Sequence, residues 1–166
     1  MLGFCTRHPR HRRFFPDISQ PRSAFDHIRS TARIMSSKIV VSTDHAPAAI
    51  GPYSQAIKAH GFVFTAGVIP LDPETKTVVG EGIEEQTQRV LTSLSGLLKA
   101  SGSSLDLAIK TTCFLTNLDD FPAFNAIYAS FFKGDQAPAR STVQVSRLPM
   151  DVLIEVECVA LLGNDA

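Results

Sequence analysis

Long apolar runs are what this sequence most clearly lacks. No stretch of its 166 residues reaches the roughly 18 consecutive apolar residues of a membrane-spanning helix. Cys113 and Cys158 have neither a CxxC spacing nor a neighbouring histidine, so they match no zinc motif and no disulfide framework. We therefore expect no membrane span and no metal site, and we predict that both cysteines are small buried residues.

A net charge is also missing, but the balance hides two different parts of the chain. Residues 1–35 hold seven arginines against two aspartates, whereas residues 36–166 hold nine basic against fourteen acidic side chains. An arginine-rich, acid-poor leader that contains serine and histidine is typical of an organellar presequence. We predict that residues 1–35 are a presequence or a disordered N-terminal extension, and that the long form is mitochondrial, in the matrix.

Two other interpretations of this leader stay open. Its basic charge could serve a nucleic-acid-binding arm, although no aromatic or glycine pattern accompanies it. Met35 and the two serines after it resemble an internal start, which would produce a shorter cytoplasmic form. The acidic balance of residues 36–166 argues against nucleic acid as a partner of the main domain.

Residues 36–166 are enough for one domain with its own core and too few for two ordinary domains. The first of two predicted helices begins with Glu84 and Glu85 and ends before Gly102. The second carries an aromatic stripe, which we expect to be core. The predicted strands are 38–42, 53–59, 62–66, 107–116, 139–145 and 152–161, and the predicted helices are 82–100 and 121–132.

This element order predicts an α+β fold with a single sheet. Two helices can cover only one face of about six strands. The other face must therefore be polar or meet another partner.

The last two predicted strands carry the residues of greatest chemical interest. We expect them to form an antiparallel hairpin, and the register that aligns their valines then places Arg140 and Thr142 on the same face as Glu155 and Glu157. That face also carries leucines, and such a mixture suits a polar cleft at a subunit interface. The plainer alternative is a structural Arg–Glu cross-strand pair, since charges in a core must be paired.

Six short motifs share the order and spacing of one protein family. They lie at residues 51–56, 65–70, 110–115, 124–128, 138–143 and 154–157, and they read GPYSQA, TAGVIP, KTTCFL, FNAIY, PARSTV and IEVE. Together they resemble the RidA/YjgF family of reactive-intermediate (enamine/imine) deaminases, over about residues 38–162. The family also includes perchloric-acid-soluble translation inhibitors.

The resemblance implies a chorismate-mutase-like fold (β-β-β-α-β-α-β-β), with one mixed sheet and two helices on one face. It also implies a homotrimer with clefts between neighbouring subunits. The implied reaction is the hydrolysis of 2-aminoacrylate, 2-iminobutanoate and similar 2-imino acids to 2-keto acids and ammonia, with no cofactor and no metal. Such imines are already electrophilic, so orientation and one activated water would be enough.

The same resemblance implies roles for individual residues. Arg140 would bind the substrate carboxylate, because a guanidinium fork matches a planar carboxylate. Glu155 would hold and activate the attacking water as a general base. The other residues implied to line the cleft are Tyr53, Gly67, Asn125 and Thr142.

Two positions depart from the family pattern. Thr142 stands where many members have cysteine, and Val68 stands where many have glutamine. A thiol-based regulation at residue 142 is therefore not expected, and the substrate preference is left open.

Three other functions are alternatives. A non-catalytic binding or regulatory role is one, and Arg140 argues against it. A translation-inhibitor (ribonuclease-like) role is the second; the acidic main domain and the lack of a histidine pair in the motifs argue against it, because only His45 and His60 lie in residues 36–166. A chaperone-like role through exposed apolar surface is the third.

Overall fold

The computed structural model describes residues 38–133 and 137–163. The predicted leader, residues 1–35, lies outside the described residues. The strands are β1 (Ile39–Val41), β2 (Ala56–Ala59), β3 (Phe62–Thr65), β4 (Ala108–Leu115), β5 (Ala139–Gln144) and β6 (Ile154–Leu161), the helices are α2 (Ile83–Ala100) and α3 (Phe121–Phe131), and three 3-10 turns are η1 (Leu105–Leu107), η2 (Leu118–Asp120) and η4 (Pro149–Asp151).

All eight predicted elements are present in the predicted order. The largest difference lies at β2, which was expected from residue 53 and begins at Ala56. Helix α2 ends as predicted, because Gly102 follows it with a φ of 77°, a backbone conformation that glycine adopts without strain. Helix α3 has Pro122 in its first turn, where the missing amide hydrogen costs no helical hydrogen bond.

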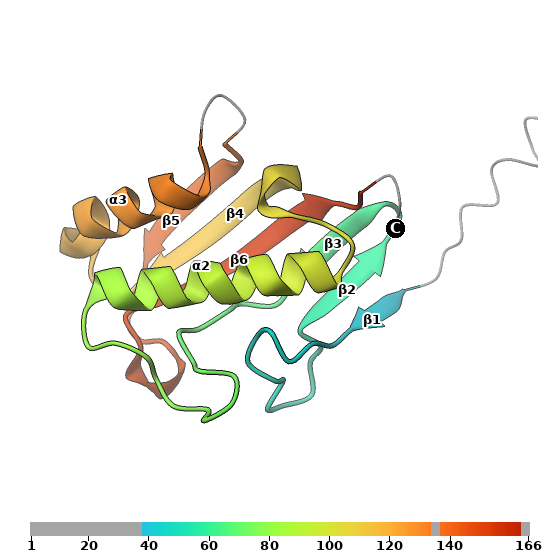
Figure 1. The fold of residues 1–166 in the computed structure, drawn as a ribbon. Coiled ribbons are helices and arrows are strands. Elements are labelled where there is room, and N and C mark those ends of the chain that lie inside the picture. The colour runs from blue at the N-terminus through green and yellow to red at the C-terminus, as the bar shows by residue number, and fades with distance from the viewer. Residues whose placement is uncertain (1–37, 134–136, 164–166) are drawn as a thin grey trace, which may run out of the picture. The chain divides into compact units, whose positions relative to one another are not determined.

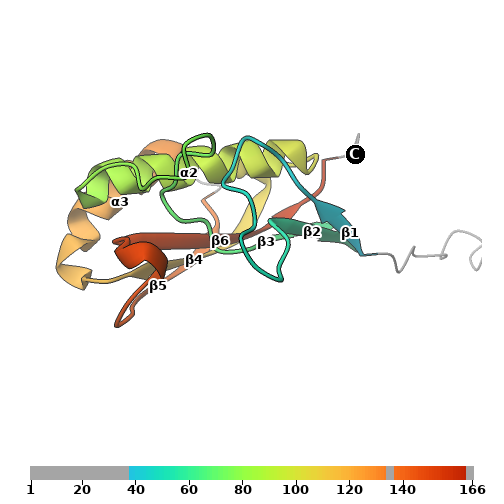
Figure 2. The same ribbon diagram turned by 90° about the horizontal axis from the view of Figure 1, so that it is seen from below.

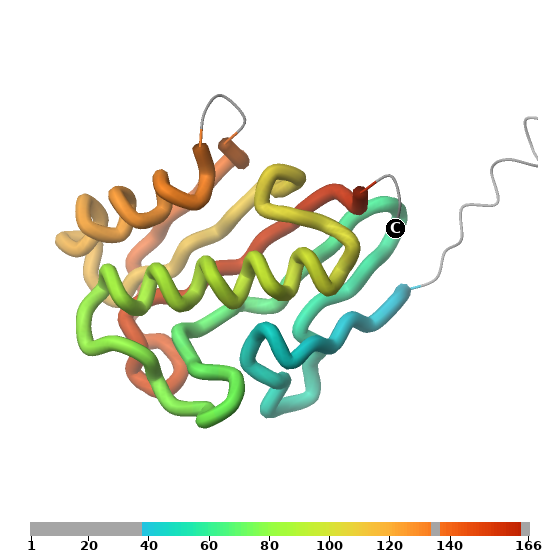
Figure 3. Tube along the Cα trace, in the orientation of Figure 1, coloured from blue at the N-terminus to red at the C-terminus, as the bar shows by residue number. Residues whose placement is uncertain are grey.

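The strands form one mixed sheet in the order β1-β2-β3-β6-β4-β5, which can be followed along the trace in Figure 3. Strands β4 and β5 are parallel, and every other neighbouring pair is antiparallel. The last strand of the chain, β6, therefore lies in the middle of the sheet, and β5 lies at an edge (Figure 1).

The predicted hairpin between the last two strands is wrong. Strand β4 lies between β5 and β6, and it pairs with β5 in parallel and with β6 in antiparallel. The reason is the helix between β4 and β5: a helical crossover returns the chain in its original direction, so β5 joins β4 as a parallel neighbour. Alternate residues of β6 are fully buried, which suits the central position that this strand takes instead.

Both helices pack on the same face of the sheet, so the domain has two layers (Figure 2). The stripe predicted on α2 is its buried side: Val90, Leu91 and Leu94 are each 0% exposed. They meet the buried residues of β6, such as Ile154 and Val156. Burial of such side chains supplies most of the favourable free energy of folding, at roughly 1.5–3 kcal/mol each.

The other face of the sheet has no helix over it. Its side chains include several large apolar groups with high exposed fractions: Val40 59%, Phe64 45%, Val143 42% and Leu161 41%. Glu155 and Glu157 of β6 point to the same face, because they alternate with the buried residues of that strand. We call this surface the open face.

No helix in residues 38–133 and 137–163 is both long enough and apolar enough to span a membrane.

Candidate functional site

Arg140 lies on the helix-covered face of the sheet. It is paired with Thr111 of β4, which is fully buried beneath the helices, and paired residues of neighbouring strands point to the same side. Its guanidinium Nη2 donates a hydrogen bond of 2.9 Å to Oδ1 of Asn125 on α3. The predicted neighbours Arg140 and Asn125 are therefore brought together by the β4-α3-β5 crossover.

Aromatic rings of α3 surround the same guanidinium. The Cζ atom of Arg140 is 4.5 Å from the ring centroid of Tyr128 and 5.4 Å from those of Phe121 and Phe124. Rings in this position attract a cation through their quadrupole but do not neutralise its charge. Within the described part of the chain, no carboxylate forms an ion pair with Arg140. Phe124, Tyr128 and Phe132 of the aromatic stripe are buried in the core, as predicted, while Phe121 is only partly buried, and the stripe also surrounds the arginine.

Thr142 follows two residues later on the same face. Its Oγ1 is buried and has no hydrogen-bond partner among the described residues. It is paired with Cys113 of β4, and burial raises the pKa of the Cys113 thiol to about 11. Burial likewise raises the pKa of Cys158 to about 12. Both cysteines are buried, as predicted, and a thiol that stays protonated is a poor nucleophile.

Glu155 lies on the opposite face. Its side chain extends over Gly67, which lies two residues after the end of β3. A Cβ at residue 67 would lie 1.7 Å from Oε1 and 2.6 Å from Cδ of Glu155, so only glycine leaves room for this carboxylate. The backbone bridge between Val68 and Val156, with N–H···O distances of 2.8 and 3.1 Å, fixes the two segments side by side.

The surroundings of Glu155 favour its protonated form. Burial raises the pKa of this half-buried carboxyl above its ordinary value, and the negative charge of Glu157 raises it further. Among the described residues no basic side chain forms an ion pair with it. A carboxyl with a raised pKa is better able to exchange a proton near neutral pH.

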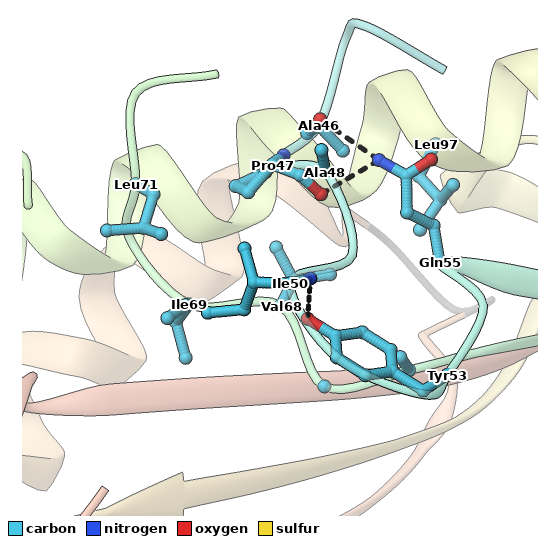
Figure 4. Close-up of a pocket in the computed structure, with 12 residues that line it drawn as sticks. Ala46, Pro47, Ala48, Ile50, Tyr53, Gln55, Val68, Ile69, Leu71 and Leu97 are labelled. Carbon is cyan, nitrogen blue, oxygen red and sulfur yellow. Dashed lines mark hydrogen bonds between the residues drawn. The ribbon is translucent and has the colours of Figure 1, made fainter. Parts of the chain in front are cut away.

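Tyr53 borders a small, largely apolar pocket that also reaches Gly67 (Figure 4). Its hydroxyl oxygen accepts a hydrogen bond of 3.4 Å from the backbone N–H of Ile50, and its side chain is 51% exposed. Ile69 and Leu71 line the pocket from the other side. The pocket offers an apolar surface next to the backbone at Gly67.

Gln55 holds the loop over this pocket, and sequence reasoning assigned it no role. Its Oε1 accepts from the N–H of Thr43 at 2.7 Å, and its Nε2 donates to the carbonyl oxygens of Thr43, Ala46 and Pro47 at 2.8–3.1 Å. The sequence signal that could have indicated this role is the loop rich in alanine and proline from Ala46 to Pro52, because its backbone N–H and C=O groups need hydrogen-bond partners. A buried amide side chain next to such a loop supplies it.

The six predicted site residues thus form two groups: one around Arg140 on the helix-covered face, and one around Gly67, where Glu155 lies on the opposite face and Tyr53 borders the neighbouring pocket. The arginine half-site is Asn125, Arg140 and Thr142, and the carboxylate half-site is Tyr53, Gly67 and Glu155. The prediction that Arg140 and Thr142 share a face with Glu155 and Glu157 is wrong, for the reason given above: β5 pairs with β4, and the pairing places Arg140 opposite Thr111 and Cys158, not opposite a glutamate. Within one chain, the guanidinium and the carboxylate do not converge on one pocket.

In residues 38–133 and 137–163, no group of three or more His, Cys, Asp or Glu side chains is arranged to hold a metal ion. His45 packs against Gly96 of α2, and His60 lies in the turn between β2 and β3. The cofactor-free site stays a prediction.

The fold and the two half-sites together define a small α+β domain that presents a guanidinium on one face of its sheet and a carboxylate on the other. The sequence model of the family described as Endoribonuclease L-PSP matches residues 43–162. The chain belongs to this family, which is the family of the Rid proteins and reactive-intermediate deaminases.

Individual relatives support the assignment. The chain is 52% identical over 125 residues to Reactive Intermediate Deaminase A, chloroplastic, of Arabidopsis thaliana, an alignment of 75% of this chain and 66% of the relative. A Rid-family protein of Yersinia pestis has a solved structure with a TM-score of 0.74 and 45% identity, over 76% of this chain and all of that one. The structure of E. coli TdcF with bound serine has a TM-score of 0.71 and 39% identity to this chain, over 75% of this chain and 99% of that one.

Proposed function

We propose that this protein is a hydrolytic deaminase of 2-imino acids. It converts 2-iminobutanoate and 2-iminopropanoate, the imine form of 2-aminoacrylate, into the 2-keto acid and ammonia. The carboxylate of the substrate binds to Arg140, and Glu155 activates the water.

The unpaired guanidinium of Arg140 is the observation that carries this proposal. It is held by the hydrogen bond that it donates to Oδ1 of Asn125 and by aromatic rings, and no described carboxylate neutralises it. A positive charge in such a setting calls for an anionic ligand. The remaining N–H groups of the guanidinium suit the two oxygens of a carboxylate. The buried Oγ1 of Thr142 adds a hydroxyl without a described partner beside it.

The comparison with TdcF is consistent with a ligand of this kind. That protein is described with bound serine, an amino acid whose carboxylate and 2-amino group match the skeleton of a 2-imino acid. The Arabidopsis relative carries the name of a reactive-intermediate deaminase. The first description supports a ligand with a carboxylate and a nitrogen on the next carbon, and the second name supports a deamination.

Two protomers are needed to complete the proposed site. Because Arg140 and Glu155 lie on opposite faces of one sheet, the arginine half-site of one protomer must meet the carboxylate half-site of its neighbour. A homotrimer achieves this in a closed ring, since each protomer offers both halves. The exposed apolar residues of the open face, such as Phe64 and Leu161, favour burial against other copies of the chain.

The chemistry requires one proton carrier. Glu155 accepts a proton from water as the oxygen bonds to C2 of the protonated imine, and a tetrahedral carbinolamine forms. The same carboxyl then returns the proton to the nitrogen. The C–N bond then breaks while the hydroxyl gives its proton to the Glu155 carboxylate, so ammonia leaves and the 2-keto acid remains. The Glu155 carboxyl passes this proton to the departing ammonia, which is released as ammonium, and the carboxylate is restored. The raised pKa of Glu155 suits this alternation.

A coupled assay tests the proposal directly. Threonine dehydratase generates 2-iminobutanoate, and the observable is the rate at which the imine disappears. We expect acceleration by the wild-type protein and at least a hundred-fold lower kcat/KM, roughly, for Arg140→Ala, because a charge-assisted bidentate contact is lost. If the wild type does not accelerate the reaction, the deaminase function is wrong.

The assembly has its own test. Sedimentation equilibrium should give three times the protomer mass, and Phe64→Asp on the open face should produce smaller species with little activity. Mixing inactive Arg140→Ala with inactive Glu155→Gln protein provides the sharper experiment. Mixed trimers contain some interfaces with two intact half-sites, so activity should return after subunit exchange. If the site lay within one protomer, mixing would restore nothing.

The location of the long form is a separate proposal. We propose that residues 1–35 direct it to the mitochondrial matrix, and that a form starting at Met35 is cytoplasmic. The chloroplastic Arabidopsis relative, of which this chain covers 66%, is an organellar protein of the same family. Imaging of both forms as fluorescent fusions tests the proposal, and identical cytoplasmic signals would overturn it.

A further inference from the structure

Three contacts connect Arg140, Thr111 and Tyr128 in a closed triangle. Arg140 and Thr111 are partners in the parallel pairing of β5 and β4. The hydroxyl groups of Thr111 and Tyr128 are 2.7 Å apart and hydrogen-bonded, in a buried position. The Tyr128 ring lies against the guanidinium at 4.5 Å, the shortest of its three aromatic contacts. Each contact has a different physical origin, and together they leave the ring little freedom.

The ring of Tyr128 is also held from its other sides. It stacks on Phe132, with centroids 4.4 Å apart and an interplanar angle of 30°, and it makes a tilted contact with Phe124 at 5.5 Å. Burial raises the pKa of its hydroxyl to about 12, so the side chain is a neutral phenol at physiological pH. Tyr128 therefore presents a fixed, uncharged surface to the guanidinium.

An uncharged surface has a specific advantage over a carboxylate at this place. A long arginine side chain loses considerable rotamer entropy when a ligand fixes it, and this loss weakens binding. A carboxylate partner would fix the guanidinium but would also occupy its N–H groups. A ring fixes it through its face and leaves the N–H groups at the edge available.

We propose that Tyr128, held by Thr111, is a positioning residue for Arg140, and that this pair sets the affinity of the site for the substrate carboxylate. The inference rests on the proposed function. Tyr128 itself does not touch the reacting atoms. Because the carboxylate is bound equally in the ground state and the transition state, loss of the ring should raise KM and leave kcat nearly unchanged.

Three single variants, the double variant Tyr128→Phe/Thr111→Val and one control test this role. Tyr128→Leu removes the ring, Tyr128→Phe keeps the ring but removes its hydroxyl, and Thr111→Val removes the partner hydroxyl with similar shape. Val90→Ala is the control, because it weakens the core at a fully buried residue of α2 outside the triangle. The measurements are KM and kcat in the coupled assay, the Kd for 2-oxobutanoate by titration calorimetry, and the melting temperature.

We expect Tyr128→Leu to raise KM and Kd about ten-fold with kcat within about two-fold of wild type. Tyr128→Phe and Thr111→Val should each raise them only about two- to three-fold, and the double variant should raise them no more than either single variant, since both remove one shared bond. Val90→Ala should lower the melting temperature while its KM stays at the wild-type value.

The proposal is overturned if Tyr128→Leu keeps the wild-type KM, if it loses kcat instead, or if Val90→Ala raises KM equally. Should Tyr128→Leu fail to fold, unchanged Kd values in both Tyr128→Phe and Thr111→Val would overturn it as well. Failure of the proposed function has a different signature: the wild type shows no deaminase activity at all, while the Kd values for 2-oxobutanoate can still be compared.

Discussion

The two half-sites differ in how they are built. Arg140 belongs to β5, and its guanidinium lies against aromatic side chains of α3, among residues of the core. The carboxylate of Glu155 lies on the open face, against Gly67, which follows β3. The contacts that hold Arg140 come from its own protomer, whereas Glu155 forms no ion pair with any described basic side chain.

This difference indicates a division of tasks. Binding of a carboxylate needs a rigid, fixed cation, and a core position provides one because close packing restricts side chains. Proton transfer needs a carboxyl whose pKa can respond to a ligand, and a partly solvated position provides that. Three substitutions test this division of tasks, and the first should reduce activity most.

Glu155→Gln should have the largest effect on turnover. The amide keeps the shape but cannot accept a proton, so we expect kcat to fall by about 10²–10⁴. KM and the Kd for 2-oxobutanoate should change little, because the arginine half-site is untouched. Steady-state kinetics and calorimetry separate the two quantities. A Glu155→Gln protein with near-normal kcat would show that another group activates the water.

Gly67→Ala should have a smaller effect through the same carboxylate. The added methyl would overlap Oε1 and Cδ of Glu155, so the side chain must move away. We expect kcat to fall about 10- to 100-fold, because a displacement of about 1 Å is costly in a site that depends on orientation. The matched control is Gly82→Ala, where an added Cβ meets nothing within 4 Å. Equal losses in both variants would contradict the steric explanation.

Glu157→Gln should shift the pH profile without abolishing activity. The charge of Glu157 raises the pKa of Glu155, so its removal lowers that pKa. The base is then ionised at lower pH, and the acid limb of the kcat/KM profile should move towards lower pH. Glu84→Gln, an exposed change in the first turn of α2, should leave the limb in place. A limb that moves to higher pH would show that Glu155 is not the titrating base.

Much of the fold could be predicted from local patterns. The stripe of α2, the aromatic residues of α3 and the alternation in β6 each follow from a periodicity of 3.6 or 2.0, so the eight elements were found. The identities of the site residues came from short motifs. Gln55 was missed because its task is to satisfy backbone groups of residues 43–47, and no periodicity records that kind of need.

The secondary-structure elements, the buried sides of α2 and β6 and the candidate residues follow from the local sequence, because these properties depend on neighbours along the chain. The position of β4 between β5 and β6, which makes Arg140 and Glu155 point to opposite faces, is a property of the assembled sheet. Strand order depends on a helical crossover and on competition among strands for the central position. Those are contacts between residues distant in sequence, and local periodicity does not encode which strand is the neighbour.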